Sequence, residues 1–190
     1  MMKEFFDEEK FENLNFQTKG LSPGDYDNCS FINCDFTRTD LSVINFLECE
    51  FIQCNLSLAK LTDTIFQDVR FLSCKLTGLH FDDCNKVIFS VTFDNCSLDV
   101  CSFYKLKMKG TCFRNSKIAE SDFEETDLSS AIFDTCDLTK SLFNHTNLEK
   151  TNFRTAFNYS IDPELNNIKK AMFSLHGITG LLDKYDIDIE

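Results

Sequence analysis

A large apolar residue recurs at every fifth position over most of this chain, and that period constrains the fold more than any other feature of the sequence. Neither the 3.6-residue period of a helix nor the two-residue alternation of a strand produces it. A short period that persists over many units predicts a solenoid, in which each unit packs only against its neighbours. We call the large apolar residues centres. They are Phe6, Phe11, Phe16, Leu21, Tyr26, Phe31, Phe36, Leu41, Phe46, Phe51, Leu56, Leu61, Phe66, Phe71, Leu76 and Phe81, then, after a step of seven residues, Ile88, Phe93, Leu98, Phe103, Met108, Phe113, Ile118, Phe123, Leu128, Phe133, Leu138, Phe143, Leu148 and Phe153.

The residue two before each centre, which we call the small position, carries a second signal. From Cys29 onward it is mostly Cys, Ser, Thr, Ala or Val. The residue directly before the centre is often Asp or Asn, as in Asn33-Cys34-Asp35-Phe36 and Thr126-Asp127-Leu128. One large and one small inward residue in each five would interleave between stacked coils and form a continuous packed column.

This pattern of a small residue, Asp or Asn, a large apolar residue and two variable residues resembles the pentapeptide-repeat family, from about residue 6 to residue 153. The resemblance implies an all-β fold, a right-handed quadrilateral (square-section) β-helix in which each pentapeptide forms one side and four form one coil. Thirty units then make about seven and a half coils. At the usual sheet spacing of about 4.8 Å, the rod would be roughly 36 Å long.

The cysteines and histidines give no sign of chemistry. Eight of the ten Cys occupy the small position, where we interpret them as core filler, because a free Cys packs as a small hydrophobe. Cys84 lies in the step between the two blocks, and we expect it to be more exposed. His80, His145 and His176 are far apart and share no ligand spacing, although a solenoid can bring distant residues together. Without a phosphate-binding loop, a nucleophile elbow or a zinc-ligand spacing, we expect no enzyme, no metal and no cofactor.

Two segments depart from the period. Residues 82–87 contain a small register slip, which we interpret as a bulge rather than as a projecting contact loop. The β-helix is predicted over residues 1–173 with an irregular last coil, because Ile168 and Phe173 resume the register.

Residues 174–190 are predicted to form a short helix with Ser174 as its N-cap, followed by an edge strand at Ile187 and Ile189. This segment is either a simple cap or the contact between two copies. The apolar face of the helix consists of Leu175, Ile178, Leu181, Leu182 and Tyr185.

The formal net charge of −12 argues against a generic nucleic-acid binder, which needs clustered Lys and Arg, and leaves open a protein partner with a basic surface. The net charge is −6 over residues 1–60, +1 over 61–120 and −7 over 121–190. With no apolar run long enough to cross a bilayer and no apolar signal core, we expect no membrane contact and a cytoplasmic location. The acids proposed to contact the partner are Asp122, Glu124, Glu125, Asp127, Asp134 and Asp137.

A C-terminal helix after the coils resembles the quinolone-resistance (Qnr) and MfpA-like branch of the family. That resemblance implies a homodimer joined through the C-terminal segment, a DNA mimic that occupies the basic DNA-binding saddle of gyrase or topoisomerase IV. It would then protect the enzyme from quinolones or inhibit it. The alternative is a non-catalytic structural or protein-interaction scaffold with a different partner, since a fold does not fix a function.

Overall fold

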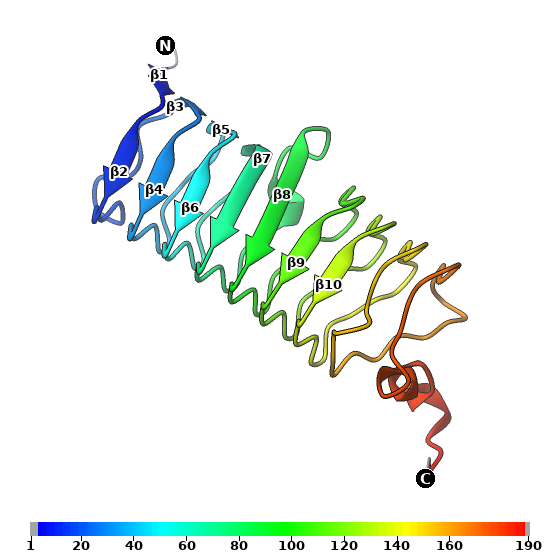
Figure 1. Ribbon diagram of the computed structural model, residues 1–190. Coiled ribbons are helices and arrows are strands. Elements are labelled where there is room, and N and C mark those ends of the chain that lie inside the picture. Colours follow the sequence, from blue (N-terminus) through cyan, green and yellow to red (C-terminus); the bar gives the residue numbers. More distant parts are fainter. Residues whose placement is uncertain (1–3, 189–190) are drawn as a thin grey trace.

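Parallel pairing between residues one coil apart builds the whole molecule. The computed structural model describes residues 4–188 and shows a right-handed β-solenoid with its N-terminus at one end of the rod and a short helical cap at the other (Figure 1). The all-β, square-section β-helix predicted from the sequence is confirmed. Its strands are β1 (Glu4–Asp7), β2 (Lys10–Glu12), β3 (Gly24–Asp27), β4 (Ser30–Ile32), β5 (Asn45–Leu47), β6 (Glu50–Ile52), β7 (Ile65–Leu72), β8 (Phe89–Asp94), β9 (Cys112–Arg114) and β10 (Ile132–Asp134).

The strands follow two of the four sides of each coil in the first block. One side stacks β1, β3, β5 and β7, and the next stacks β2, β4, β6 and β7, always in parallel register. In the second block only one side keeps strands, as β8 pairs with β9 and β9 with β10. The remaining sides are joined by isolated parallel bridges such as Asp35 with Asn55.

The centres form the core as predicted. Phe31, Phe51 and Phe71 are completely buried, and burying one such side chain contributes about 1.5–3 kcal/mol. Rings on the same side stack between coils, with 4.8 Å between the centroids of Phe31 and Phe51. Rings on opposite sides of the square meet edge to face across the core, as Phe113 and Phe123 do at an interplanar angle of 90°. Each such pair adds about 0.5–1.5 kcal/mol beyond the buried area.

The Asp or Asn before each centre stabilises the corner that follows it. The carboxylate Oδ1 of Asp35 accepts the backbone N–H of Thr37 at 2.9 Å, and that of Asp122 accepts the N–H of Glu124 at 2.8 Å. The residue two after the centre takes a positive φ, as Arg38 does at 56°. A side chain that bonds its own backbone two residues on is suited to such a tight turn, which explains the preference for Asp and Asn at this position.

The small position supplies a hydrogen-bond donor to the preceding coil. The hydroxyl of Thr126 donates to the carbonyl of Phe103 at 2.8 Å, and the thiol of Cys54 donates to the carbonyl of Phe31 at 3.2 Å. The cysteines therefore do more than fill space, because they also bond a backbone carbonyl of the coil below. Both roles require a small side chain that points inward.

The step between the blocks differs from the sequence-based expectation. Phe89, not Ile88, faces the core: it pairs with Phe66, and its ring lies 5.9 Å from that of Phe81. Ile88 is 40% exposed. The expectation that Cys84 is exposed is also wrong, since the short 3-10 helix η1 (Phe81–Asp83) turns it inward. Burial raises the pKa of the Cys84 thiol well above its ordinary value.

The C-terminal segment is helical but is not one continuous α-helix. It forms two 3-10 helices, η2 (Gly177–Leu181) and η3 (Asp183–Tyr185). The hydroxyl of Ser174 accepts the N–H of Gly177 at 3.0 Å, but the N-cap of η2 is His176 rather than the expected Ser174. Residues 187–188 do not form the expected edge strand, and Ile189 lies outside the described residues.

The two glycines of the cap allow it to lie directly on the last coil. A Cβ on Gly177 would come within 2.1 Å of the hydroxyl oxygen of Tyr159, and a Cβ on Gly180 within 2.1 Å of the carbonyl oxygen of Tyr159. Helix propensity would favour other residues at both positions. The close approach to Tyr159 explains why glycine is needed there.

Candidate functional site

The six acids proposed from the sequence lie at two different corners of the solenoid. Asp122, Glu124, Glu125 and Asp127 surround the corner between the sides centred on Phe123 and Leu128. The other two, Asp134 and Asp137, surround the corner ten residues further on. Since each side takes five residues, the two corners are diagonally opposite in the square section. A flat partner surface therefore meets one group or the other, whereas a concave surface that wraps around the rod can reach both.

Three of these acids have structural roles in the turns. Asp122, Asp127 and Asp137 directly precede centres, and each accepts the backbone N–H two residues on. Asp137 also accepts the hydroxyl of Thr139 at 2.6 Å and the amide of Asn158 at 2.9 Å. Partial burial would raise the pKa of Asp137, but these hydrogen bonds outweigh it and leave that pKa below its usual value. The repeat pattern itself was the signal that these residues cap turns.

The other three acids stand at positions that face solvent. Glu125 forms an ion pair with Lys105 at 3.3 Å and accepts the hydroxyl of Tyr104 at 3.1 Å. Asp134 lies 3.7 Å from the Nε of Arg114. Within residues 4–188, Glu124 has no side-chain partner, so of the six it is the acid whose charge is most open to another molecule.

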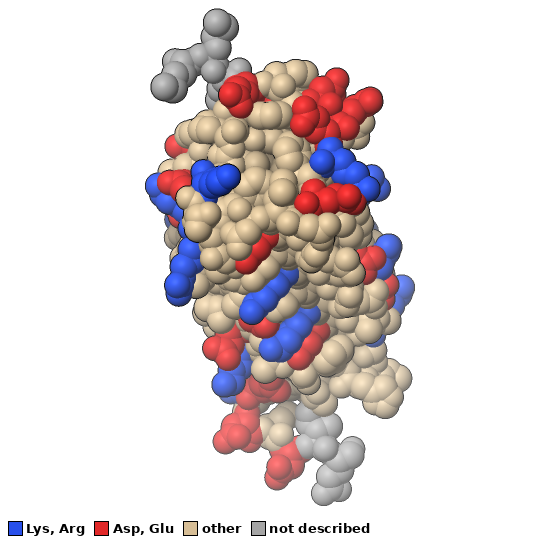
Figure 2. All heavy atoms as spheres, turned by 90° about the vertical axis from the view of Figure 1, so that its left-hand side faces the viewer, with Lys and Arg blue, Asp and Glu red and all other residues tan. Residues whose placement is uncertain are grey.

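Charge is distributed along the rod as the sequence suggests. In Figure 2, acidic side chains lie at both ends of the visible face, and Lys and Arg are interspersed with Asp and Glu over its middle. The sequence analysis did not identify a run of acids that stack along one corner of the first four coils, and we call this the N-terminal acidic ridge. It consists of Asp7, Glu8, Asp27, Glu48 and Asp68, at positions one and two after the centres of β1, β3, β5 and β7.

The apolar face predicted for the C-terminal helix is divided by the structure. Leu175 is 88% exposed, while Ile178 and Tyr185 are about half exposed. Leu181 instead packs against the core, and Leu182 is only partly exposed. The expected five-residue contact is therefore three outward side chains, the partly exposed Leu182, and Leu181, which helps to attach the cap.

An ion-pair cluster holds the cap to the last coil. The Nζ of Lys184 lies 2.7 Å from Asp162 and 2.8 Å from Glu164, and the hydroxyl of Tyr185 donates to Glu164 at 3.1 Å. Hydrogen bonds from Lys184 lower the pKa of both carboxyl groups. This cluster and the Gly177–Tyr159 contact fix the orientation in which Leu175 and Ile178 are presented.

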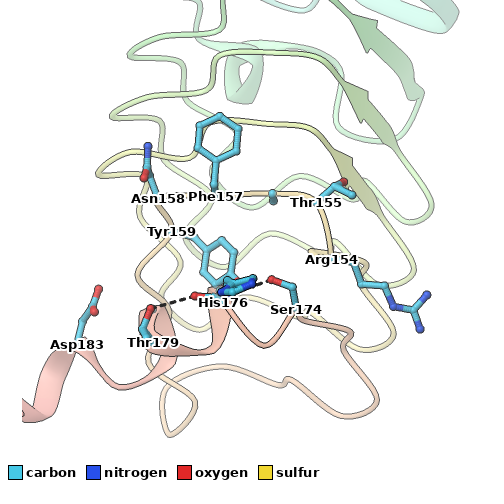
Figure 3. A pocket seen from close by; sticks show the side chains of 12 residues that line it. Arg154, Thr155, Phe157, Asn158, Tyr159, Ser174, His176, Thr179 and Asp183 are labelled. Carbon is cyan, nitrogen blue, oxygen red and sulfur yellow. Dashed lines mark hydrogen bonds between the residues drawn. The ribbon is translucent and has the colours of Figure 1, made fainter. Parts of the chain in front are cut away.

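A cavity of about 510 Å³ lies between the last coil and the cap (Figure 3). The Ser174 hydroxyl accepts a backbone N–H, and the Thr179 hydroxyl donates to the carbonyl of His176. The guanidinium of Arg154 points away from the cavity (Figure 3). Among the described residues that line it, no two side chains form a nucleophile–base hydrogen bond, so the cavity shows no catalytic arrangement. Residues 4–188 likewise contain no cluster of three potential metal ligands and no helix able to cross a membrane.

Comparisons with known proteins identify the family. The model of the pentapeptide repeat region matches residues 25–100, and the model of pentapeptide repeats in eight copies matches residues 119–156. The chain belongs to the pentapeptide-repeat family. No protein with a curated description matches it significantly.

Solved structures of other pentapeptide-repeat proteins share the fold. Full-length QnrB1, a plasmid-mediated fluoroquinolone resistance protein, is 16% identical over 97% of this chain and 100% of its own, with a TM-score of 0.50. A trypsin-treated QnrB1 variant is 18% identical over 98% and 92%, with a TM-score of 0.54. HetL from the cyanobacterium Nostoc sp. strain PCC 7120, involved in heterocyst differentiation regulation, is 13% identical over 90% and 86%, with a TM-score of 0.50. At these identities the similarity establishes the fold alone.

Proposed function

We propose that this protein is a non-catalytic DNA mimic that binds the DNA-binding surface of a type II topoisomerase, gyrase or topoisomerase IV, as a homodimer. The observation that carries the proposal is the distribution of charge on a rigid rod, with acids towards both ends. A net charge of −12 over a length of roughly 36 Å is about one charge per 3 Å, against about one per 1.7 Å in duplex DNA.

The C-terminal cap supports a dimer of this kind. Leu175 exposes 88% of its surface, and Ile178 and Tyr185, which are about half exposed, lie on the same short C-terminal segment. Burying such side chains against a second copy yields about 25 cal/mol per Å² of apolar surface. Two rods joined at this end would place their C-terminal acids, including Glu124, on either side of the joint. The N-terminal acidic ridges would lie at the far ends.

The acids that stand in for phosphates would be those whose charge is open to a partner. Glu124 contributes directly, and Glu125 and Asp134 contribute in exchange for their present ion pairs. Asp122, Asp127 and Asp137 contribute one carboxylate oxygen while the other caps a turn. Because such contacts are electrostatic and exposed, affinity for the partner should fall as salt rises.

The test is a gyrase supercoiling assay and a quinolone-induced cleavage assay, with and without ciprofloxacin, at micromolar protein. We expect reduced supercoiling or reduced drug-induced cleavage. Glu124→Gln should weaken the effect, while Glu120→Gln, which removes an equal charge at another corner of the same coil, should weaken it less. No effect on either activity with gyrase from the same cell would contradict the proposal.

A second candidate function is a non-catalytic scaffold for a different protein with a basic surface. The observation in its favour is that half of the expected phosphate mimics are turn caps, so the acidity at 122–137 partly serves the fold. Capture of a basic partner without any effect on gyrase would favour this candidate.

A further inference from the structure

Among the described residues, β1 and β2 have no pairing partner on the side away from β3 and β4, which leaves an open sheet edge at the opposite end of the rod from the cap (Figure 1). In later coils the N–H of each residue equivalent to Lys10 bonds the coil before it, as Ser30 N–H donates to the carbonyl of Glu9 at 2.9 Å. The carbonyl of Asp27 likewise accepts the N–H of Glu8 from the preceding coil at 3.0 Å. In the first coil, the matching N–H of Lys10 and carbonyl of Asp7 point to a side on which residues 4–188 place no other coil.

The rings of the first coil are covered on one side only. Phe6 and Phe11 stack on Tyr26 and Phe31 at 4.5 and 4.8 Å. They remain only partly buried, whereas Tyr26 and Phe31, which have coils on both sides, are 1% and 0% exposed. The open end therefore combines unpaired backbone groups with an apolar platform, which are the two elements used when an extended peptide adds to a sheet edge.

Charge determines which segment fits this edge. Between residues 4 and 12 there are five acids and one base: Glu4, Asp7, Glu8, Glu9 and Glu12 against Lys10. Lys10 already pairs with Glu12 at 2.6 Å. A second copy of the same edge would bring like charges together, which disfavours self-association. A segment rich in Lys or Arg would instead be attracted.

We propose that β1 and β2 bind an extended basic segment of a partner protein, which adds as a parallel strand ahead of the first coil. Apolar residues five apart in that segment would rest on Phe6 and Phe11. Its basic residues would face the surrounding carboxylates, and its backbone would bond the N–H of Lys10 and the carbonyl of Asp7. This site lies away from the cap and does not depend on binding to a topoisomerase.

The probe is a synthetic nine-residue peptide with Phe at its third and eighth positions and Lys and Thr elsewhere, labelled for fluorescence anisotropy with the full-length protein. A matched peptide with Glu in place of Lys is the control for charge. We expect saturable binding of the Lys peptide in 50 mM salt, at least tenfold tighter than that of the Glu peptide. Failure of the Lys peptide to bind would overturn the proposal.

A proline at position 10 separates edge pairing from simple charge attraction. Lys10→Pro removes the outward N–H, and proline is tolerated on an edge strand where that N–H faces solvent. We expect an unchanged melting temperature and at least a tenfold loss of peptide affinity. Unchanged affinity would place the peptide elsewhere on the acidic surface and contradict the proposal. A dimer of the native protein that Lys10→Pro converts to a monomer would show that a second copy occupies the edge instead.

Discussion

The two blocks of the solenoid use the same repeat but differ in the chemistry of the small position. In the first block its commonest residue is cysteine, as at Cys29, Cys49 and Cys54, and in the second it is mostly serine or threonine, as at Ser121 and Thr126. The thiols of the first block donate to the preceding coil over 3.2–3.6 Å, whereas the hydroxyls of Ser121 and Thr126 donate over 2.6 and 2.8 Å. The first block also keeps strands on two sides and the second on one. The pentapeptide therefore specifies geometry, while the strength of the inter-coil hydrogen bonds varies between blocks.

The largest expected effect comes from removing a ring, and it should be equal in both blocks. Phe113→Ala and Phe51→Ala each remove a ring that is fully buried between stacked neighbours. Each should lower the free energy of unfolding by about 3–5 kcal/mol. Phe6→Ala, in the half-open first coil, should cost clearly less. Urea unfolding followed by circular dichroism measures all three, and a Phe6 effect as large as the others would show that the end is covered.

Substitutions of the small-position donor should change stability by different amounts in the two blocks. Thr126→Val keeps the shape of the side chain but loses the hydroxyl that bonds the carbonyl of Phe103, at a cost of about 1–3 kcal/mol. Cys54→Ser should change the stability by less than about 1 kcal/mol, because Ser116 already occupies the same column. The same urea titration reports both variants. A neutral Thr126→Val would mean that this hydroxyl acts mainly as filler.

Substitutions at the corners should have a smaller effect on stability, and they should increase it. Val43 in the first block and Val100 in the second are β-branched residues with φ of 59° and 58°. Asparagine tolerates this conformation better, so Val43→Asn and Val100→Asn should each stabilise the protein by roughly 0.5–1 kcal/mol. Both valines are more than half exposed, so little packing is lost. Thermal melting measures the gain, and a loss at either position would identify a packing role for that valine.

The smallest global effect is expected at the cap. The folded-state pKa values of Asp162 and Glu164 are lowered by Lys184, so their contribution is present above their unfolded pKa of about 4 and is lost as pH falls through the folded values. Below about pH 4 the cap should release from the last coil while the coils persist. Faster hydrogen exchange of the backbone amides of residues 174–188 measures this release. Lys184→Met should abolish the pH dependence, whereas Lys169→Met, on the last coil, should not.

The period allowed most of the fold to be predicted from sequence, because a centre such as Phe93 has only one inward environment to occupy. The local errors arose where the period stops. Between Phe81 and Phe93 the sequence allowed either Ile88 or Phe89 to face the core, and the bridge to Phe66 selects Phe89. Gly177 and Gly180 reduced the helical signal of the cap, and their contact with Tyr159 is tertiary, so it cannot be found in a local pattern.

The surface was less predictable than the core. A count of acids along the chain could not show that Asp134 and Asp137 lie diagonally opposite Asp122 and Asp127. It also did not identify the N-terminal acidic ridge, whose members are one coil apart in sequence. Assigning each residue to its side of the square would have revealed both features.

Competition with DNA for gyrase tests the proposed function most directly. A fluorescently labelled duplex is bound to gyrase, the full-length protein is titrated in, and anisotropy is followed at 50, 100 and 200 mM salt. We expect the protein to displace the duplex, with an affinity that falls as salt rises and that Glu124→Gln reduces more than Glu120→Gln does. Failure to displace the duplex at 50 mM salt and micromolar protein would contradict DNA mimicry.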